Sequence, residues 1–227
     1  MASTEASVVL VHGAWADGSS WAGVIALLAK SGIKVLAAPL PLTSFEADVE
    51  ALDRTLARAL GPVVLAGHAY AGAVIGATRS AAVKALVYVA ALAPDEGETV
   101  LDVFTRAAPH PQAPKLAPDD HGLIYLPDSA FAAAFAQHAS AEKLAVLAAV
   151  QQPIAPACIT TAMARPLWKD RPAWFLVAEQ DRMIAPETQA FMAKRMQART
   201  RSLPVDHAPL VTAPGAVVDL ILEAVRA

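Results

Sequence analysis

Val63-Val64-Leu65-Ala66-Gly67-His68-Ala69-Tyr70-Ala71-Gly72 is the most informative stretch of this 227-residue chain. Its four leading apolar residues predict a buried strand, a turn of small residues follows, and the apolar run through Ile75 predicts a helix. Such a strand–turn–helix is typical of a nucleophile elbow, G-x-S-x-G, whose strained apex residue aims its side chain into a site. The apex here is Ala69, and Ala71 stands where the last glycine would be. The stretch therefore predicts a nucleophile elbow whose apex carries no nucleophile.

Strand and helix patterns alternate on either side of this stretch. Short apolar runs predict five further strands, at 7–11, 34–38, 85–90, 173–178 and 201–205. The last run contains Pro204, which indicates a strand at the edge of the sheet. Helical patterns separate the first four strands. The alternation predicts an α/β fold, in which six mainly parallel strands carry helices on both faces.

Several residues predict where the helices begin. Thr43-x-x-Glu46 is a capping-box pattern, and the helix that it opens has apolar residues at spacings of three and four. Further caps or first-turn residues are expected at Ser19 or Ser20, Asp128, Ser140 and Pro186.

The segment from about 96 to 171 breaks the alternation. It is rich in proline, contains no convincing strand and shows two amphipathic helical patterns. Because it has too few apolar residues for a core of its own, we expect a helical cap inserted after the fourth strand. The chain 1–227 is thus predicted to be a single domain, with a core of about 5–95 and 172–227.

Composition excludes several classes of function. The chain has 56% hydrophobic residues, 17% charged residues and a net charge of −3, which suits a buried core and offers no basic run for nucleic acid. No apolar run is long enough for a membrane span, and Met1–Glu5 lacks the basic start of a secretion signal. The single cysteine, Cys158, excludes an internal disulfide. We therefore expect a cytoplasmic protein, and a homodimer stays an open expectation.

Three positions follow strand ends in the order nucleophile, acid, histidine. Position 69 follows the third strand, Asp181 the fifth and His207 the sixth. The carboxyl ends of parallel strands meet at one edge of the sheet, where ligands of open α/β sheets bind. In a catalytic triad the histidine takes the proton of a serine hydroxyl, and the carboxylate holds the imidazole in the required tautomer. Glu179 and Asp95 are rival acids.

The same chemistry needs donors for an oxyanion. The amide of Tyr70, just after the apex, is one candidate, and the amide of Ala14, in the loop after the first strand, is the other. The candidate substrate-binding residues are Trp15, Tyr125 and Trp168. No spacing of histidine and acidic residues indicates a metal site.

Four motifs together resemble those of the α/β-hydrolase superfamily, and within it the compact branch of plant methyl esterases, hydroxynitrile lyases and bacterial esterases. They are Leu10-Val11-His12-Gly13-Ala14-Trp15, which is similar to an oxyanion loop, Gly67-His68-Ala69-Tyr70-Ala71-Gly72, which is similar to a G-H-S-Y-G-G elbow, Glu179-Gln180-Asp181-Arg182 and Asp206-His207-Ala208-Pro209. The resemblance covers nearly the whole chain and is weakest in the cap. It implies metal-free and cofactor-free hydrolysis of carboxylic esters through an acyl-enzyme.

Ala69 departs from this pattern, because a methyl group cannot attack an ester. Since the other parts are in place, we hypothesise that the natural residue is serine and that this chain is the inactive Ser→Ala form. Its cap carries many apolar residues and few charges, so the expected substrate is a small to medium apolar ester or lactone. One alternative is a natural ligand-binding pseudoenzyme. The other is a hydroxynitrile lyase, which the resemblance would equip with a cap lysine, for which the candidates are Lys115, Lys143 and Lys169.

Overall fold

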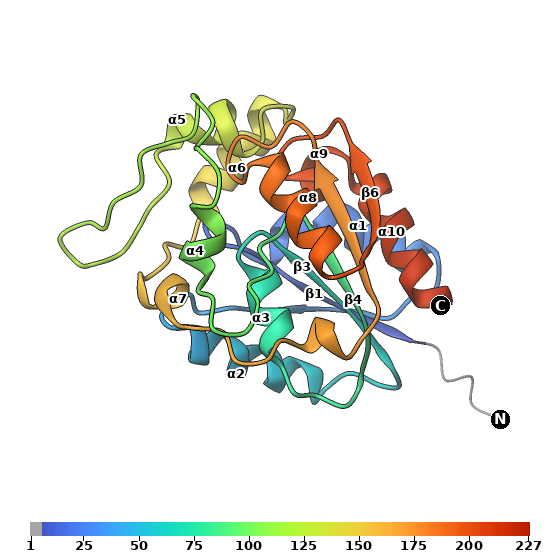
Figure 1. The fold of residues 1–227 in the computed structure, drawn as a ribbon. Helices are drawn as coiled ribbons and strands as arrows, with labels where there is room; N and C mark the ends of the chain where they lie inside the picture. The colour runs from blue at the N-terminus through green and yellow to red at the C-terminus, as the bar shows by residue number, and fades with distance from the viewer. Residues whose placement is uncertain (1–5) are drawn as a thin grey trace.

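A computed structural model describes residues 6–227, so the expectation about Met1–Glu5 lies outside the described residues. The centre of the fold is a six-stranded sheet in the order β2-β1-β3-β4-β5-β6, and every neighbouring pair of strands is parallel (Figure 1). The strands are β1 (Ser7–Val11), β2 (Val35–Ala38), β3 (Val63–His68), β4 (Val83–Val89), β5 (Ala173–Ala178) and β6 (Arg199–Leu203). This confirms the α/β fold predicted from the alternating pattern.

The strands in the middle of the sheet are mostly apolar because helices cover both of their faces. Every residue of β1, β3 and β5 is buried. Strand β6 is polar and partly exposed, as an edge strand is. It begins two residues earlier than predicted, and Pro204 follows its last paired residue, Leu203, because a proline has no N–H to add to the ladder.

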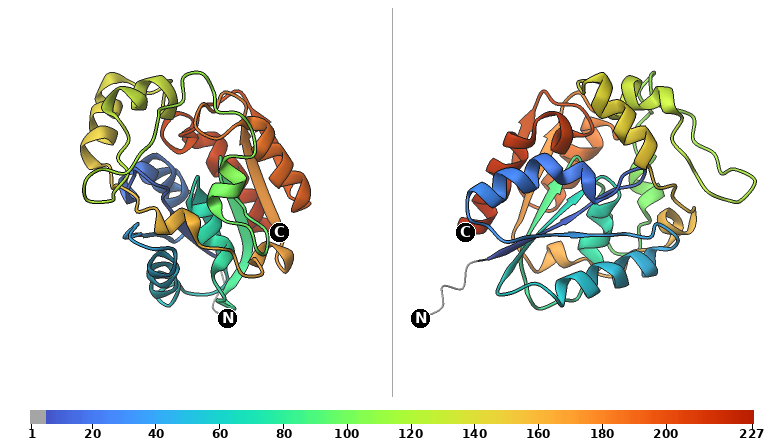
Figure 2. Two further views of the ribbon diagram at one scale, coloured as in Figure 1. Left: turned by 60° about the vertical axis from the view of Figure 1, so that its left-hand side comes forward. Right: turned by 180° about the vertical axis from the view of Figure 1, so that it is seen from behind.

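Helices pack on both sides of the sheet. Helix α1 (Ala22–Lys30) lies against the C-terminal helix α10 (Pro214–Arg226), and α10 also contacts β3, β4 and β5. On the other face, α3 (Ala71–Ala77) packs on β3 and beside α2 (Phe45–Leu56), and α8 (Pro186–Arg195) packs on β5. The view from behind brings α1 to the front of the molecule, which shows that it is on the face opposite to α3 (Figure 2).

Between β4 and β5 the chain forms only short helices and loops. They are α4 (Val100–Phe104), α5 (Asp128–Ala130), η2 (Phe131–Phe135), α6 (Ala141–Val150), α7 (Ala157–Thr160) and η3 (Leu167–Lys169). Most of these elements gather above one end of the sheet, whereas η3 lies beside α3 near the start of β5. The loop between α4 and α5 projects away from the body of the molecule (Figure 1). The helical cap after the fourth strand is thereby confirmed.

The helix starts differ in part from those expected. Ser140 caps α6 and Pro186 opens α8, as predicted. Ser44, and not Thr43, caps α2: its side chain accepts the N–H of Ala47 at 3.1 Å, which leaves no capping box at this helix. Neighbouring hydroxyl residues are equally good caps, so the sequence alone could not choose between them.

Two other helix starts also differ. Asp17 caps the short helix η1 (Gly18–Trp21) that leads into α1, so neither Ser19 nor Ser20 is the cap. Asp128 is the first residue of α5 and makes no capping bond.

Candidate active site

The apex of the elbow is held in a strained conformation by backbone hydrogen bonds. Ala69 follows β3 with φ +50°, a left-handed conformation that non-glycine residues avoid. Its N–H donates to the carbonyl of Val89 at 3.3 Å, and its carbonyl accepts the N–H groups of Gly72 and Leu92 at 3.1 and 2.9 Å. The end of β4 and the segment after it therefore fix the apex, and the Ala69 side chain lines a cavity.

Two glycines of the motif are required by close approach. A Cβ added at Gly67 would lie 2.8 Å from the carbonyl oxygen of Ala71, and one added at Gly72 would collide with the carbonyl oxygen of Leu92. The start of α3 thus lies too close to β3 for a side chain at position 67, and too close to the segment after β4 for one at position 72. Ala71 replaces the last glycine of the pattern without strain of this kind, because it is a regular helical residue at the start of α3.

Asp181 and His207 meet as a buried pair. Nδ1 of His207 donates to Oδ2 of Asp181 at 2.8 Å, and both residues are 2% exposed. The carboxylate also accepts the N–H groups of Met183 and Ile184 at 2.8 Å and the side-chain amide of Gln189 at 2.7 Å. Since Nδ1 carries the hydrogen towards Asp181, the other ring nitrogen of His207 is left as a proton acceptor. His207 lines the same cavity as Ala69.

The ring of His207 packs against two side chains that the sequence pattern did not single out for this role. Phe135, from η2 of the cap, meets it edge-on with ring centroids 5.1 Å apart. His68 lies on it at 4.8 Å, and the Nε2–H of His68 donates to the backbone carbonyl of His207 at 2.7 Å. Complete burial holds the pKa of His68 well below its usual value, so this ring is neutral. A cap residue and the residue before the apex therefore set the place of the candidate base.

The two candidate oxyanion donors lie at the edge of the cavity with free amides. Ala14 and Tyr70 both line it, and neither N–H has a hydrogen-bond partner among the described residues. His12 explains the direction of the Ala14 amide. Its Nε2 accepts the N–H of Leu40 at 3.0 Å, so its Nδ1–H donates to the carbonyl of Gly13 at 2.9 Å. That carbonyl belongs to the same planar peptide group as the Ala14 N–H, so holding one directs the other.

The cavity is almost entirely apolar. Its volume is about 210 Å³. Besides Ala14, Ala69, Tyr70 and His207, it is lined by Trp15, Leu92, Val100, Leu101, Phe104, Leu116, Ile124, Ile154, Ile159, Met183 and Ile184. Most of the latter come from the cap, so the core supplies the polar groups and the cap supplies the apolar wall. No charged side chain lines it in the part of the chain that the structure describes.

The structure brings only one of the three aromatic substrate-binding candidates to this cavity. Trp15 lines it, with its indole N–H donating to the carbonyl of Ile124 at 2.9 Å. Tyr125 does not: it alternates in an extended segment with the buried Ile124 and Leu126, so its side chain is turned to solvent and is 47% exposed. Trp168 is buried elsewhere, and its indole donates to the carbonyl of Pro94 at 3.3 Å.

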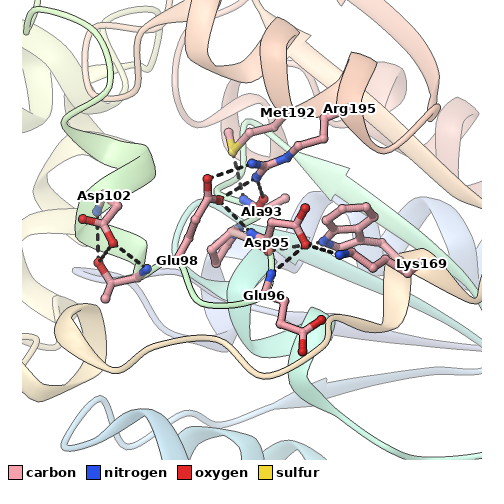
Figure 3. A network of polar contacts seen from close by, with 11 residues as sticks. Ala93, Asp95, Glu96, Glu98, Asp102, Lys169, Met192 and Arg195 are labelled. Atoms are coloured by element: carbon pink, nitrogen blue, oxygen red, sulfur yellow. Dashed lines mark hydrogen bonds and ion pairs between the residues drawn. The ribbon is translucent and has the colours of Figure 1, made fainter.

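The rival acids are engaged in other contacts. Figure 3 shows Asp95 in a polar network with Lys169 and Glu98, and its carboxylate lies 2.5 Å from the Nζ of Lys169. Hydrogen bonds from Lys169 and from the amide of Glu96 lower the pKa of Asp95 even though its partial burial opposes this. Glu179 is exposed and accepts the hydroxyl of Ser202 at 2.7 Å. Of the three acids, only Asp181 contacts His207.

The cap lysines also lie away from the cavity. Lys169 pairs with Asp95, and Nζ of Lys143 donates to the carbonyl of Val211 at 2.9 Å. Neither these two nor Lys115 lines the cavity.

The comparison with known families agrees with the fold. The chain belongs to the alpha/beta hydrolase family, whose model matches residues 8–220. Its structural neighbours include a polyneuridine aldehyde esterase and a tomato methylketone synthase, each 18% identical to it, and they share its fold. No helix in residues 6–227 is both long and apolar enough to cross a bilayer.

Particular relatives are distant. A carbendazim-hydrolysing esterase of Nocardioides sp. (strain SG-4G) is 33% identical over 119 residues, which are 46% of this chain and 49% of that enzyme. The match therefore spans about half the length of that relative. Polyneuridine aldehyde esterase superimposes with a TM-score of 0.84 at 18% identity, over 96% of this chain and 98% of its own. A pyrethroid hydrolase from Sphingobium faniae JZ-2 superimposes with a TM-score of 0.82 at 22% identity, over 98% of both chains. These two structures are similar to this chain in fold.

Proposed function

We propose that this protein is a carboxylic ester hydrolase whose nucleophile position carries alanine in place of serine. The observation that supports the proposal is the grouping of Ala69, His207 and two free amides around one apolar cavity, with Asp181 behind the imidazole. A histidine–aspartate pair of this kind activates a hydroxyl, and amides of this kind stabilise an oxyanion. The chain as printed lacks only the hydroxyl.

With serine at position 69, each group has a defined role. His207 takes the hydroxyl proton as the oxygen attacks the ester carbonyl, and the amides of Ala14 and Tyr70 receive the negative charge that develops on the carbonyl oxygen. The imidazolium then protonates the leaving alcohol, and the acyl-enzyme remains. Water, activated by the same imidazole, releases the acid. Asp181 stabilises the imidazolium in both halves of the reaction.

The substrate class follows from the wall of the cavity. An apolar wall with no charged side chain favours uncharged acyl and alcohol groups, because a buried charge without a partner is strongly destabilising. Its volume of about 210 Å³ suits a small to medium ester or lactone. The relatives include a carbendazim-hydrolysing esterase, and a protein similar in fold is a pyrethroid hydrolase, which supports hydrolysis as the reaction.

The test is to restore the hydroxyl. The Ala69→Ser protein should hydrolyse p-nitrophenyl butyrate roughly 10⁴- to 10⁶-fold faster than the printed chain, which is the scale at which serine hydrolases lose activity without their nucleophile. Adding His207→Gln to Ala69→Ser should abolish the gain. A p-nitrophenyl ester of a dicarboxylic acid, matched in length but charged at its far end, should react far more slowly.

A ligand-binding pseudoenzyme is the second candidate, and the alanine itself favours it. It predicts that the printed chain binds butyrate esters, or their acids, and that Ala69→Ser brings no turnover. Isothermal titration of the printed chain with an unreacted ester, together with the assay above, separates the two functions. If the Ala69→Ser protein is folded but inactive, ligand binding remains as the only one of the two functions. No cap lysine lines the cavity in the described chain, so nothing supports a hydroxynitrile lyase.

A further inference from the structure

A buried carboxyl group lies behind the elbow, outside the cavity. Asp48, in the first turn of α2, is completely buried, and no ion pair involves it among the described residues. Its Oδ2 accepts the hydroxyl of Tyr70 and its Oδ1 accepts the N–H of Leu42, both at 2.7 Å. The buried Cys158 lies close to this carboxyl group.

Burying such a group is unfavourable for the free energy of folding. A carboxyl group that leaves water without a cation beside it loses its hydration, and hydrogen bonds recover only part of the loss. Burial accordingly raises the pKa of Asp48, although Tyr70 and Leu42 oppose the rise. The contact with Leu42 has a structural purpose, because that residue has a left-handed backbone with φ +57° after β2. Holding Leu42 explains the contact of Oδ1, but it does not explain why Oδ2 accepts the hydroxyl of Tyr70.

Tyr70 connects this carboxyl group to the chemistry. Its side chain is 3% exposed and its hydroxyl ends on Asp48, whereas its backbone N–H is one of the two free amides at the cavity. Tyr70 precedes the first helical residue of α3 and makes no side-chain capping bond, so its own side chain is the polar anchor of this residue. Burial and the neighbouring Asp48 raise the pKa of Tyr70 far above its ordinary value, so the hydroxyl remains a donor.

The two sides of the oxyanion site are therefore built alike. His12 holds the peptide group that presents the Ala14 amide, and Asp48 holds the side chain of the residue that presents the Tyr70 amide. Both anchors are buried polar side chains that do not line the cavity. We propose that Asp48 is a positioning residue of the oxyanion site, which acts through the Tyr70 hydroxyl to hold the Tyr70 N–H on the developing oxyanion. This role rests on the proposed ester hydrolysis.

The test uses the Ala69→Ser protein as the reference enzyme. Asp48→Asn and Tyr70→Phe should each lower kcat about tenfold or more with KM changed less than about twofold, because an oxyanion donor acts in the transition state and misplacing it loses part of its effect. The double variant should be no slower than the slower single variant, since both remove one link. Thr55→Val is the matched control: this residue is also buried on α2, but its hydroxyl donates within the helix, to Ala51, and kcat should stay unchanged.

A second readout does not need activity. In the printed chain, the backbone amide resonance of Tyr70 should shift in a ¹⁵N–¹H spectrum of Asp48→Asn and stay in place in Thr55→Val. In the Ala69→Ser background, one contrary result is that folded Asp48→Asn and Tyr70→Phe variants both keep the kcat of the reference enzyme, and the other is that their losses add in the double variant. Either result would overturn the role of Asp48 and leave the ester hydrolysis standing. An inactive Ala69→Ser protein would overturn the ester hydrolysis and this role with it. If Asp48→Asn does not fold, the kcat of Tyr70→Phe and the amide resonances of the residues next to position 70 decide in its place whether Asp48 has this role.

Discussion

The Nε2 of His68 lies 2.7 Å from the carbonyl oxygen of His207, and the two imidazoles face each other at an angle of 50°. Because a carbonyl can only accept, the hydrogen of His68 is on Nε2, and its buried Nδ1 has no partner among the described residues. The residue before the apex thus carries part of the loop that holds the candidate base. Complete burial lowers the pKa of His68 and keeps its ring neutral, and a positive charge there would in addition repel protonated His207.

This arrangement predicts how stability depends on pH. The pKa values of His12 and His68 are lowered, mainly by burial, so the folded protein binds fewer protons than the unfolded chain below the unfolded value of about 6.5. The free energy of unfolding should therefore decrease as the pH falls from 7.5 to 5.5, by up to about 1.4 kcal/mol per pH unit for each such histidine. Urea unfolding at several pH values measures this slope. His68→Gln, which keeps a donor but does not titrate, should make the slope shallower, whereas the exposed His121→Gln should not. Equal slopes in all three proteins would contradict it.

Two glycines of the same helix should respond oppositely to alanine. At Gly72 a Cβ would lie 2.8 Å from Ala91 Cβ and collide with the Leu92 carbonyl, so Gly72→Ala should destabilise the protein by about 1–3 kcal/mol or prevent folding. At Gly76 the nearest atom is 3.6 Å away, which is ordinary contact, so Gly76→Ala should be neutral or stabilising by up to about 1 kcal/mol. Thermal and urea unfolding of both variants measure the difference. A stable Gly72→Ala protein would refute the close approach of α3 to the residues after β4.

The apex alanine itself should be a site of strain. With φ +50°, Ala69 is in a region that costs an L-residue roughly 1 kcal/mol and costs glycine little, so Ala69→Gly should stabilise the protein by about 0.5–1 kcal/mol. Ala73→Gly, in the interior of α3, should do the reverse. Urea midpoints give both values. A loss of stability at position 69 equal to that at position 73 would show that the left-handed conformation is not retained in solution.

The ion pair between Arg195 and Glu98 should stabilise the junction of cap and core. Figure 3 shows the two side chains joined by paired contacts, at 2.9 Å each, between α8 and the start of the cap. Glu98→Gln should lower the free energy of unfolding by about 1–2 kcal/mol, because it leaves a largely buried guanidinium without its counter-charge. The more exposed pair of Arg201 and Glu223 is the control, and Glu223→Gln should change stability by less than about 1 kcal/mol. Equal effects would rule out a special role for the junction.

Much of the fold could be predicted because its signals are local. Strands that are buried on both faces are mostly apolar, so runs such as 7–11 and 173–178 are visible in the sequence. The order of the candidate site was visible too, since Asp181 and His207 directly follow strands. Their contact at 2.8 Å agrees with the expectation, while their part in catalysis stays a prediction.

What could not be predicted depends on contacts between distant segments. The cavity wall combines side chains from several cap helices with the loop after β1, and no local pattern says that Tyr125 turns outwards while Ile124 turns inwards. The role of His68 requires a contact with a residue 139 positions away. Asp48 did leave a signal, because an acidic residue stands between Phe45 and Leu52 on the buried side of α2. A charge on the apolar side of a helix is a reason to look for a buried partner.

The backbone hydrogen bonds of the apex residue, Ala69, involve only residues outside the cap. Ala69 is clamped by Val89 and Leu92, which belong to the end of β4 and the residues just after it, and no backbone bond from residues 96–171 reaches it in the described chain. The part of the molecule that would hold a nucleophile is therefore mechanically separate from most of the part that would choose its substrate. Exchanging the insert between β4 and β5 would alter which molecules enter while the elbow kept its shape. This core should therefore accept caps from other proteins of the same fold.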